Sequence, residues 1–259
     1  MLKFAANLSL LFTELPLLQR FAAAAQAGFG AVEIQFPYDY PADVLAAAAS
    51  AAGVEVILIN VPAGDLMQGG AGLAGHPARQ AEFAAVLPQA LAYARALGVR
   101  MLNVLPGRLA EGVGREQALA TLAANLDLAA DYFRPHGIRV LCEAINDIDM
   151  PGFLLRTADE VAEVLAACNS RDIGMQVDIY HMARMGQDIP VLLATHLPAI
   201  AHVQFADAPG RGEPGSGNLP LQQYFALLVQ LGYRGWLAAE YRPTRPTAET
   251  LGWLPAAAC

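Results

Sequence analysis

The chain has 259 residues, of which 55% are hydrophobic, and a formal net charge of −8. Its 16 Lys and Arg residues form no cluster, so the composition disfavours binding to nucleic acid. No apolar run approaches the roughly 18 residues of a membrane span. The three cysteines, Cys142, Cys168 and Cys259, are too scattered for a disulfide framework or a zinc finger. We therefore expect a soluble cytoplasmic protein that acts on a small molecule and binds neither nucleic acid nor membranes.

Predicted strands and helices alternate along the whole chain. Apolar segments predict eight strands, at residues 3–8, 31–36, 54–61, 100–105, 138–145, 173–179, 200–206 and 236–241. Segments rich in Ala and Leu predict eight helices, at residues 14–27, 41–52, 77–97, 115–134, 157–168, 187–196, 220–231 and 246–254. Several helices end at a glycine just before a strand, as in RALGVRML, which is the usual helix-to-strand junction. This alternation is typical of a parallel sheet covered by helices.

Eight such units in 259 residues match the size of a (β/α)8 barrel. An open, doubly wound sheet is the alternative, but it usually carries a Gly-rich phosphate loop after an early strand. Here the first strand continues into NLSLLFTE, which contains no G-x-G-x-x-G. We therefore predict the α/β class, with a (β/α)8 TIM barrel that forms a single domain over residues 1–259.

Side chains with oxygen atoms mark the ends of the last four predicted strands. They are Glu143, Asp178, Gln204 and Glu240. A single acid at a strand end is more commonly an ion-pair partner or a solvated loop residue, but four ends in succession favour a shared site. Active-site residues of barrels lie at these ends, where neighbouring strands bring their side chains together. Three carboxylates at close range repel one another, and a divalent cation held by oxygen ligands, Mg²⁺ or Mn²⁺, would relieve that repulsion.

Three more polar residues are candidates for the same pocket. His181 follows Asp178 by three positions, which favours a role in the pocket. Arg211 lies in the Gly- and Pro-rich segment 208–219, where a guanidinium would match an anionic group. An ordinary surface loop explains that segment equally well. His202, two positions before Gln204, shares its strand face and competes with it as a ligand.

Nine ordered blocks of the chain resemble the hydroxypyruvate isomerase family of xylose-isomerase-like barrels. They include FAANLSLLFTE, NVPAGD, QVDIYHMARM, HVQFAD, RGEPGSG and GWLAAEYRP. The resemblance implies that Glu143, Asp178, Gln204 and Glu240 hold a divalent metal, Mg²⁺ or Mn²⁺. It also implies that Glu143 and Glu240 are the catalytic acid/base pair and that His181 and Arg211 contact the substrate. The family's ligand is the Gln of H-x-Q, which favours Gln204 over His202.

The implied reaction interconverts hydroxypyruvate and 2-hydroxy-3-oxopropanoate (tartronate semialdehyde) through an enediolate. A 2-oxo-tetronate isomerase and a ketose 3-epimerase remain alternatives, because the first shares most of these blocks and the second would use the same carboxylates. An endonuclease is disfavoured, since it needs several metal-binding histidines and a basic face. Leu66 and Asn218 depart from the family pattern, and we expect them to line the pocket entrance. The Ala-rich helices either pack in the core or bind a second copy, which leaves a homo-oligomer open.

Overall fold

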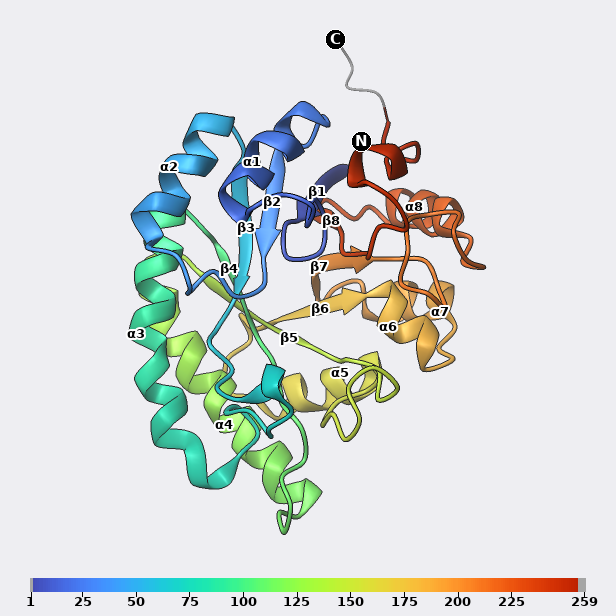
Figure 1. Ribbon diagram of the computed structural model, residues 1–259. Helices are drawn as coiled ribbons and strands as arrows, with labels where there is room; N and C mark the ends of the chain where they lie inside the picture. The colour runs from blue at the N-terminus through green and yellow to red at the C-terminus, as the bar shows by residue number, and fades with distance from the viewer. Residues whose placement is uncertain (1, 256–259) are drawn as a thin grey trace.

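A closed barrel of eight parallel strands forms the centre of the molecule (Figure 1). The structure is a computed structural model that describes residues 2–255. The strands are β1 (Lys3–Asn7), β2 (Ala31–Ile34), β3 (Glu55–Asn60), β4 (Met101–Val104), β5 (Arg139–Glu143), β6 (Gly174–Asp178), β7 (Ile200–Phe205) and β8 (Trp236–Ala239). Each strand pairs with the next in sequence order, and β8 pairs with β1. The predicted barrel is therefore confirmed, and closure leaves no strand edge exposed. The single domain was expected to extend to residue 259. Residues 256–259, including Cys259, lie outside the described residues.

Helices surround the strands (Figure 1). They are α1 (Leu17–Gln26), α2 (Ala42–Ala52), α3 (Gln80–Leu97), α4 (Arg115–Phe133), α5 (Ala158–Ala167), α6 (Ile179–Arg184), α7 (Ile189–His196) and α8 (Leu221–Gln230), with short 3-10 turns η1 (Leu66–Gln68), η2 (Pro77–Arg79), η3 (Arg134–His136) and η4 (Thr247–Thr250). Gly98 ends α3 at φ +71°, in the left-handed region that glycine adopts without strain. The Thr157 hydroxyl accepts a hydrogen bond from the Glu160 backbone N–H and caps α5. No helix of the described part is long and apolar enough to cross a membrane.

Two helices differ from the sequence-based expectation. The six-residue α6 begins directly after β6, where the Asp178 side chain accepts a hydrogen bond from the Tyr180 backbone N–H. A segment this short carries too little periodicity to be predicted. The helix predicted at 246–254 is wrong, since only η4 forms there. Instead of continuing a helix, Trp253 packs edge-on against Phe4 of β1 and Phe205 of β7, with ring centroids 5.4 and 5.1 Å away.

The barrel interior is apolar at one end and polar at the other. Apolar residues fill the end where the strands begin, among them Ala5, Leu141 and Ala238. Toward the strand ends the buried side chains are polar, and they comprise Asn7, Glu33, Asn60, Asn103, Glu143, Gln176, Asp178, His202, Gln204 and Glu240. Branched apolar residues dominate most barrel interiors. A local departure of this kind marks a functional region, and it lies at the carboxyl ends of the strands.

Candidate active site

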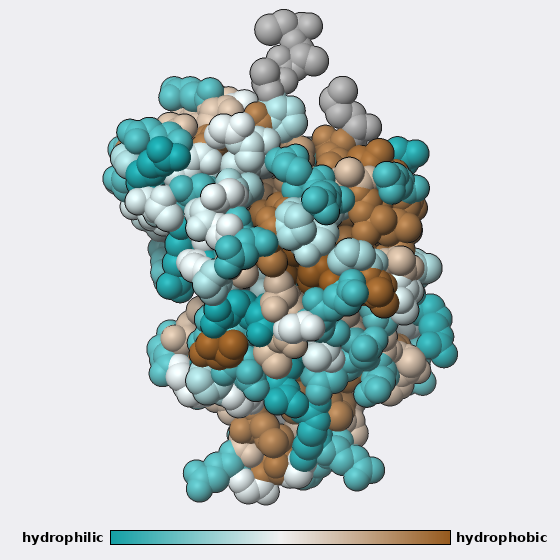
Figure 2. Space-filling view, turned by 90° about the vertical axis from the view of Figure 1, so that its right-hand side faces the viewer, coloured by the Kyte–Doolittle hydropathy of each residue, from teal (hydrophilic) through white to brown (hydrophobic). Residues whose placement is uncertain are grey.

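A small cavity opens among the polar side chains at the strand ends. Its volume is about 150 Å³. Figure 2 views the molecule from the side toward which β6 and β7 run, and it shows hydrophobic patches between hydrophilic ones. The cavity is lined by Leu10, Gln35, Phe36, Asn60, Met67, Leu105, Glu143, Ile145, Asp149, Met150, Gln176, His181, Gln204, Arg211, Glu240 and Arg242. Five of the six residues singled out from the sequence are in this lining, and the sixth, Asp178, is fully buried beside it.

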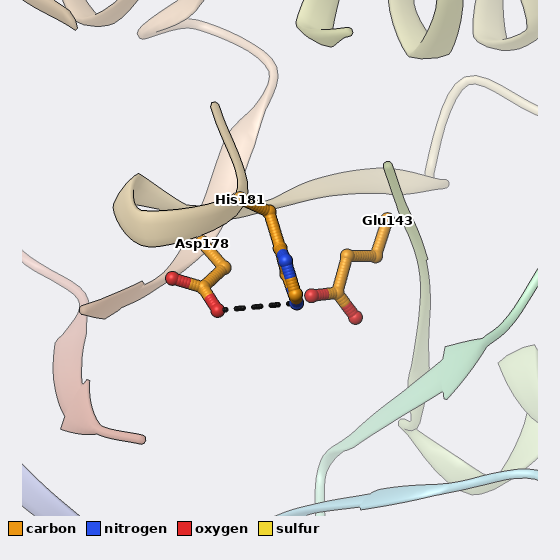
Figure 3. Close-up of side chains that lie close together, drawn as sticks. All are labelled: Glu143, Asp178 and His181. Atoms are coloured by element: carbon orange, nitrogen blue, oxygen red, sulfur yellow. Dashed lines mark ion pairs between the residues drawn. The ribbon is translucent and has the colours of Figure 1, made fainter. Parts of the chain in front are cut away.

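Glu143, Asp178 and His181 form a compact group with the spacing of a metal site. One ligand atom from each lies within 4.8 Å of the others, and all three side chains are buried. In Figure 3 the imidazole stands between the two carboxylates. The Nε2 atom of His181 lies 3.5 Å from Oδ2 of Asp178. The group therefore joins the ends of β5 and β6 to the start of α6.

Glu240 reaches this group through Arg211. The Nη2 atom of Arg211 lies 2.7 Å from Oε1 of Glu240 and 3.4 Å from Oδ2 of Asp178. Arg211 has a backbone φ of +56°, which few residues other than glycine adopt. Its guanidinium lies over the ring of Tyr180 at 5.2 Å. Glu240 itself follows β8 by one residue and also accepts a 2.7 Å hydrogen bond from Nε2 of Gln35.

Gln204 and Glu143 share a hydrogen-bond donor, the side-chain amide of Gln176. The Nε2 atom of Gln176 donates to Oε1 of Gln204 at 2.7 Å and to Oε2 of Glu143 at 2.9 Å. Asn103 donates a further hydrogen bond of 2.8 Å to the same Glu143 oxygen. The four strand-end residues predicted from the sequence therefore lie around one point of the barrel mouth, bridged by amide and guanidinium donors.

His202 has a different neighbour. Its Nε2 atom lies 2.7 Å from Oε2 of Glu33, and both side chains are fully buried. His202 is absent from the cavity lining, whereas Gln204 is part of it. Sequence reasoning missed Glu33, although an acid in the apolar run AVEI carries the same signal as Glu143 in VLCEAI. Glu33 was overlooked because it lies inside its strand rather than at the end.

Burial and mutual repulsion raise the pKa values of the site carboxylates. The pKa of Glu143 is held well above its ordinary value by burial, then by the charges of Glu240 and Asp178. Burial raises the pKa of Asp178 to about 6 and that of Glu240 to about 8, although Arg211 opposes both shifts. The three buried acids lie near one guanidinium, that of Arg211, which pairs with only two of them, Asp178 and Glu240. This excess of carboxylate oxygen fits a divalent cation.

The ring of His181 is neutral and of defined tautomer. Burial and the nearby Arg211 charge hold its pKa well below the ordinary value. Its Nδ1 atom lies 2.6 Å from Nδ2 of Asn146, whose Oδ1 already accepts from the backbone N–H groups of Ile148 and Asp149. The amide nitrogen of Asn146 must therefore face the ring, and Nδ1 is the acceptor. Nε2 then carries the proton, so His181 presents a hydrogen-bond donor to the site rather than a metal ligand.

Comparison with known proteins agrees with this architecture. The family described as Xylose isomerase-like TIM barrel matches residues 21–257. The chain belongs to this family. The hydroxypyruvate isomerase of Escherichia coli is 40% identical over 98% of both chains. The 2-oxo-tetronate isomerase of Haemophilus influenzae is 37% identical over 97% of both. The protein is therefore an isomerase-type enzyme of this family, and the resemblance inferred from its sequence blocks is confirmed.

Solved structures repeat the fold at two levels of similarity. A Brucella melitensis protein described as an AP endonuclease of family 2 is 40% identical, covers 98% of both chains and superposes with a TM-score of 0.94. An L-ribulose 3-epimerase is 24% identical, with a TM-score of 0.77 over 97% of this chain and 85% of its own. At that identity the likeness to the epimerase supports the fold alone.

The two departures from the family pattern lie elsewhere than expected. Leu66 is fully buried and packs with Leu105 and Ile145 beneath the mouth. Asn218 is exposed, and its backbone N–H donates to the carbonyl of Ala208. Neither side chain lines the cavity, so the expectation that they form its entrance is wrong. Met67, the neighbour of Leu66, lines the cavity instead.

Proposed function

We propose that the protein is a metal-dependent isomerase that interconverts hydroxypyruvate and 2-hydroxy-3-oxopropanoate. The observation that carries this proposal is the position of Glu143 at the end of β5 and Glu240 directly after β8, which face one small cavity from strands that are not neighbours. The relatives of similar length that act on small hydroxy-oxo acids support it. The three scattered cysteines, with no C-x-x-C pair, support a reducing, cytoplasmic location.

A divalent cation, Mg²⁺ or Mn²⁺, would be held by Glu143, Asp178, Gln204 and Glu240. Three carboxylates and an amide oxygen are the ligands these hard cations prefer, and the surplus of buried acid over guanidinium supports the assignment. When bound, the cation would supply Lewis-acid polarisation of the substrate carbonyl.

The two glutamates would move the proton. One carboxylate removes a proton from C3 of hydroxypyruvate, and the electron pair of that C–H bond forms the enediolate. The other glutamate returns a proton to C2, and a proton passes between the two oxygens, which gives the aldehyde without loss or gain of atoms. The pKa values of both Glu143 and Glu240 are raised toward or above neutrality, which allows one to be protonated while the other is ionised.

Arg211 and His181 would orient the substrate. The Nε atom of Arg211 is buried without a hydrogen-bond partner among the described residues, so a substrate carboxylate would satisfy a donor that the protein leaves free. The Nε2–H group of His181 would donate to a substrate oxygen. The cavity of about 150 Å³ is well below the ~300–1,000 Å³ of sites for larger ligands, which favours acids of three or four carbons.

A 2-oxo-tetronate isomerase is the second candidate, because its relatives reach almost the same identity. A ketose 3-epimerase would use the same carboxylates, but the small cavity counts against hexoses. A nuclease function, as in the description of the Brucella relative, is disfavoured for this chain. Of its five histidines only His181 lines the cavity, and its net charge of −8 opposes DNA binding.

The deciding experiment is an NMR time course in D₂O. Protein stripped of metal is mixed with hydroxypyruvate, with and without Mg²⁺ or Mn²⁺. We expect the aldehyde product to appear, with deuterium incorporated, only when metal is added. Failure to turn over or exchange hydroxypyruvate with either metal would overturn the proposal, and turnover of 2-oxo-tetronate in its place would establish the second candidate.

A further inference from the structure

Glu33 lies at the centre of a buried polar cluster that the proposed reaction does not use. Its Oε1 accepts from Nδ2 of Asn7 at 2.7 Å and from Nε2 of Gln204 at 2.6 Å. Its Oε2 accepts from Nε2 of His202 at 2.7 Å. None of these four side chains is more than 2% exposed. Three donors from β1 and β7 therefore converge on one carboxylate of β2.

Stability alone is a poor reason for this cluster. A buried charged or polar group must recover its lost hydration through partners, and well-packed apolar residues in its place are commonly as stable or more stable. Apolar side chains fill the adjacent end of the same barrel. The cluster also touches Gln204, which the proposed function makes a metal ligand, so orientation of that ligand is a better explanation.

Only one orientation of the Gln204 amide agrees with its neighbours. Glu33 presents oxygen to one end of the amide, so the nitrogen of Gln204 must face Glu33. At the other end, Oε1 of Gln204 accepts from Nε2 of Gln176. That nitrogen is itself held by Oε2 of Glu143. A flipped Gln204 would oppose oxygen to oxygen at Glu33 and nitrogen to nitrogen at Gln176.

The Glu33 carboxylate is held in place by donors that are themselves fixed. Oδ1 of Asn7 accepts from the backbone N–H of Ser9 at 2.9 Å, which turns Nδ2 of Asn7 toward Glu33. His202 binds the second carboxylate oxygen from the same strand as Gln204. Glu33 therefore has little freedom to follow Gln204 if that amide turns.

We propose that Glu33 is a positioning residue that holds the Gln204 amide with its oxygen toward the metal site. His202 and Asn7 hold Glu33 in turn. The proposal rests on the proposed function, because it takes Gln204 as a ligand. A glutamine binds a cation through oxygen alone, so an amide free to flip would present its nitrogen part of the time and bind more weakly.

The test is Mn²⁺ affinity of the metal-stripped full chain, measured by calorimetry and by the EPR spectrum of the bound ion. Glu33→Leu removes the oxygen that holds the amide nitrogen of Gln204, and we expect the affinity to fall by about tenfold or more, as for other residues that orient metal ligands. The matched control is Asn125→Leu, which also replaces a buried polar side chain by an apolar one. Asn125 lies on α4, away from the cavity, and donates to the carbonyl of Ala74. We expect this control to lower Tm and leave Mn²⁺ affinity within about twofold.

A polarity swap provides the second measurement, including for the case that Glu33→Leu does not fold. In Gln204→Glu, two carboxylates face each other at positions 33 and 204. Adding Glu33→Gln restores a hydrogen bond between these positions, with residue 33 now the donor and residue 204 the acceptor. The double variant should bind Mn²⁺ more tightly than Gln204→Glu alone, although short of the unaltered protein, because Asn7 keeps its donor toward position 33. Unchanged Mn²⁺ affinity in Glu33→Leu, or no gain in the double variant, would overturn the positioning role. If Gln204→Leu also keeps full affinity, the error lies in the proposed ligand set.

Discussion

The Nη2 atom of Arg211 lies 2.7 Å from Oε1 of Glu240, so a cation and a proposed proton-transfer group share one hydrogen bond. The same nitrogen lies 3.4 Å from Asp178. Because Arg211 lowers the pKa of both acids against the effect of burial, it connects the proposed substrate-binding group with the proposed acid–base pair. Changes at either end should therefore affect both binding and rate.

Replacing either glutamate by glutamine should abolish most turnover and preserve the fold. General acid–base groups typically contribute about 10²–10⁴-fold to rate, so we expect kcat for Glu143→Gln and Glu240→Gln to fall within that range. Tm should not decrease, since each change removes a buried acid with a raised pKa. Glu163→Gln on the exposed face of α5 is the matched control. A near-normal rate in either variant would exclude that carboxylate from the mechanism.

Replacing Arg211 or Arg242 by methionine should have different effects on KM and kcat. Arg211 contacts both acids and its side chain is only 13% exposed, so we expect Arg211→Met to raise KM and lower kcat, each by about tenfold or more. Arg242 is exposed and only lines the cavity. We expect Arg242→Met to raise KM by a few-fold at unchanged kcat, because it removes only binding that is equal in the ground and transition states.

Steady-state kinetics on hydroxypyruvate measure both variants, with Arg95→Met, exposed in the last turn of α3, as the control. A larger KM effect at Arg242 than at Arg211 would transfer the carboxylate-binding role to Arg242.

The metal-free protein should lose stability as pH rises from about 6.5 to about 8. Burial raises the pKa of Glu240 from 4.5 to about 8, and that of Glu143 well above 4.5. In this range the folded protein keeps protons that the unfolded chain has released, so the free energy of unfolding falls with pH. His181, whose pKa is lowered from 6.5, contributes the opposite slope only below about 6.5, which sets the window.

Thermal unfolding in EDTA at constant ionic strength measures this slope. Glu240→Gln should flatten it, and Mn²⁺ should raise Tm most at the upper end of the range, where the carboxylates are free to bind it. A Tm of the metal-free protein that rises toward pH 8 would contradict the prediction.

Trp253 should stabilise the barrel although it lies outside every helix. Its ring packs on Phe4 and Phe205, which belong to different strands. Trp253→Ala should lower the free energy of unfolding by about 2–4 kcal/mol, less than for a fully buried tryptophan because the side chain is partly exposed. Tyr132→Ala, at an exposed aromatic residue of α4, should cost less than about 1 kcal/mol. Urea denaturation compares the two, and equal losses would remove Trp253 from the core.

Much of the candidate site follows from local pattern. Glu143 and Asp178 each end a strand that the run of apolar residues makes recognisable. Because parallel strands end at one edge, their convergence needs no knowledge of distant contacts. The glycine-ended helices were predictable for the same reason, since αβ junctions are set by neighbouring residues.

Contacts between residues far apart in the chain were beyond such reasoning. Glu33 and His202 are 169 positions apart and meet only because the barrel closes and directs both side chains inward. The direction of the Arg211 guanidinium depends on a left-handed backbone in a loop that its composition does not specify. The last predicted helix failed because packing of Trp253 on two strands outweighed local helix propensity. The sequence by itself determined the barrel and the acids at its mouth, because these depend on periodicity and strand order. Tertiary structure alone decided how those acids are partnered, because hydrogen-bond polarity and burial are properties of the assembled interior.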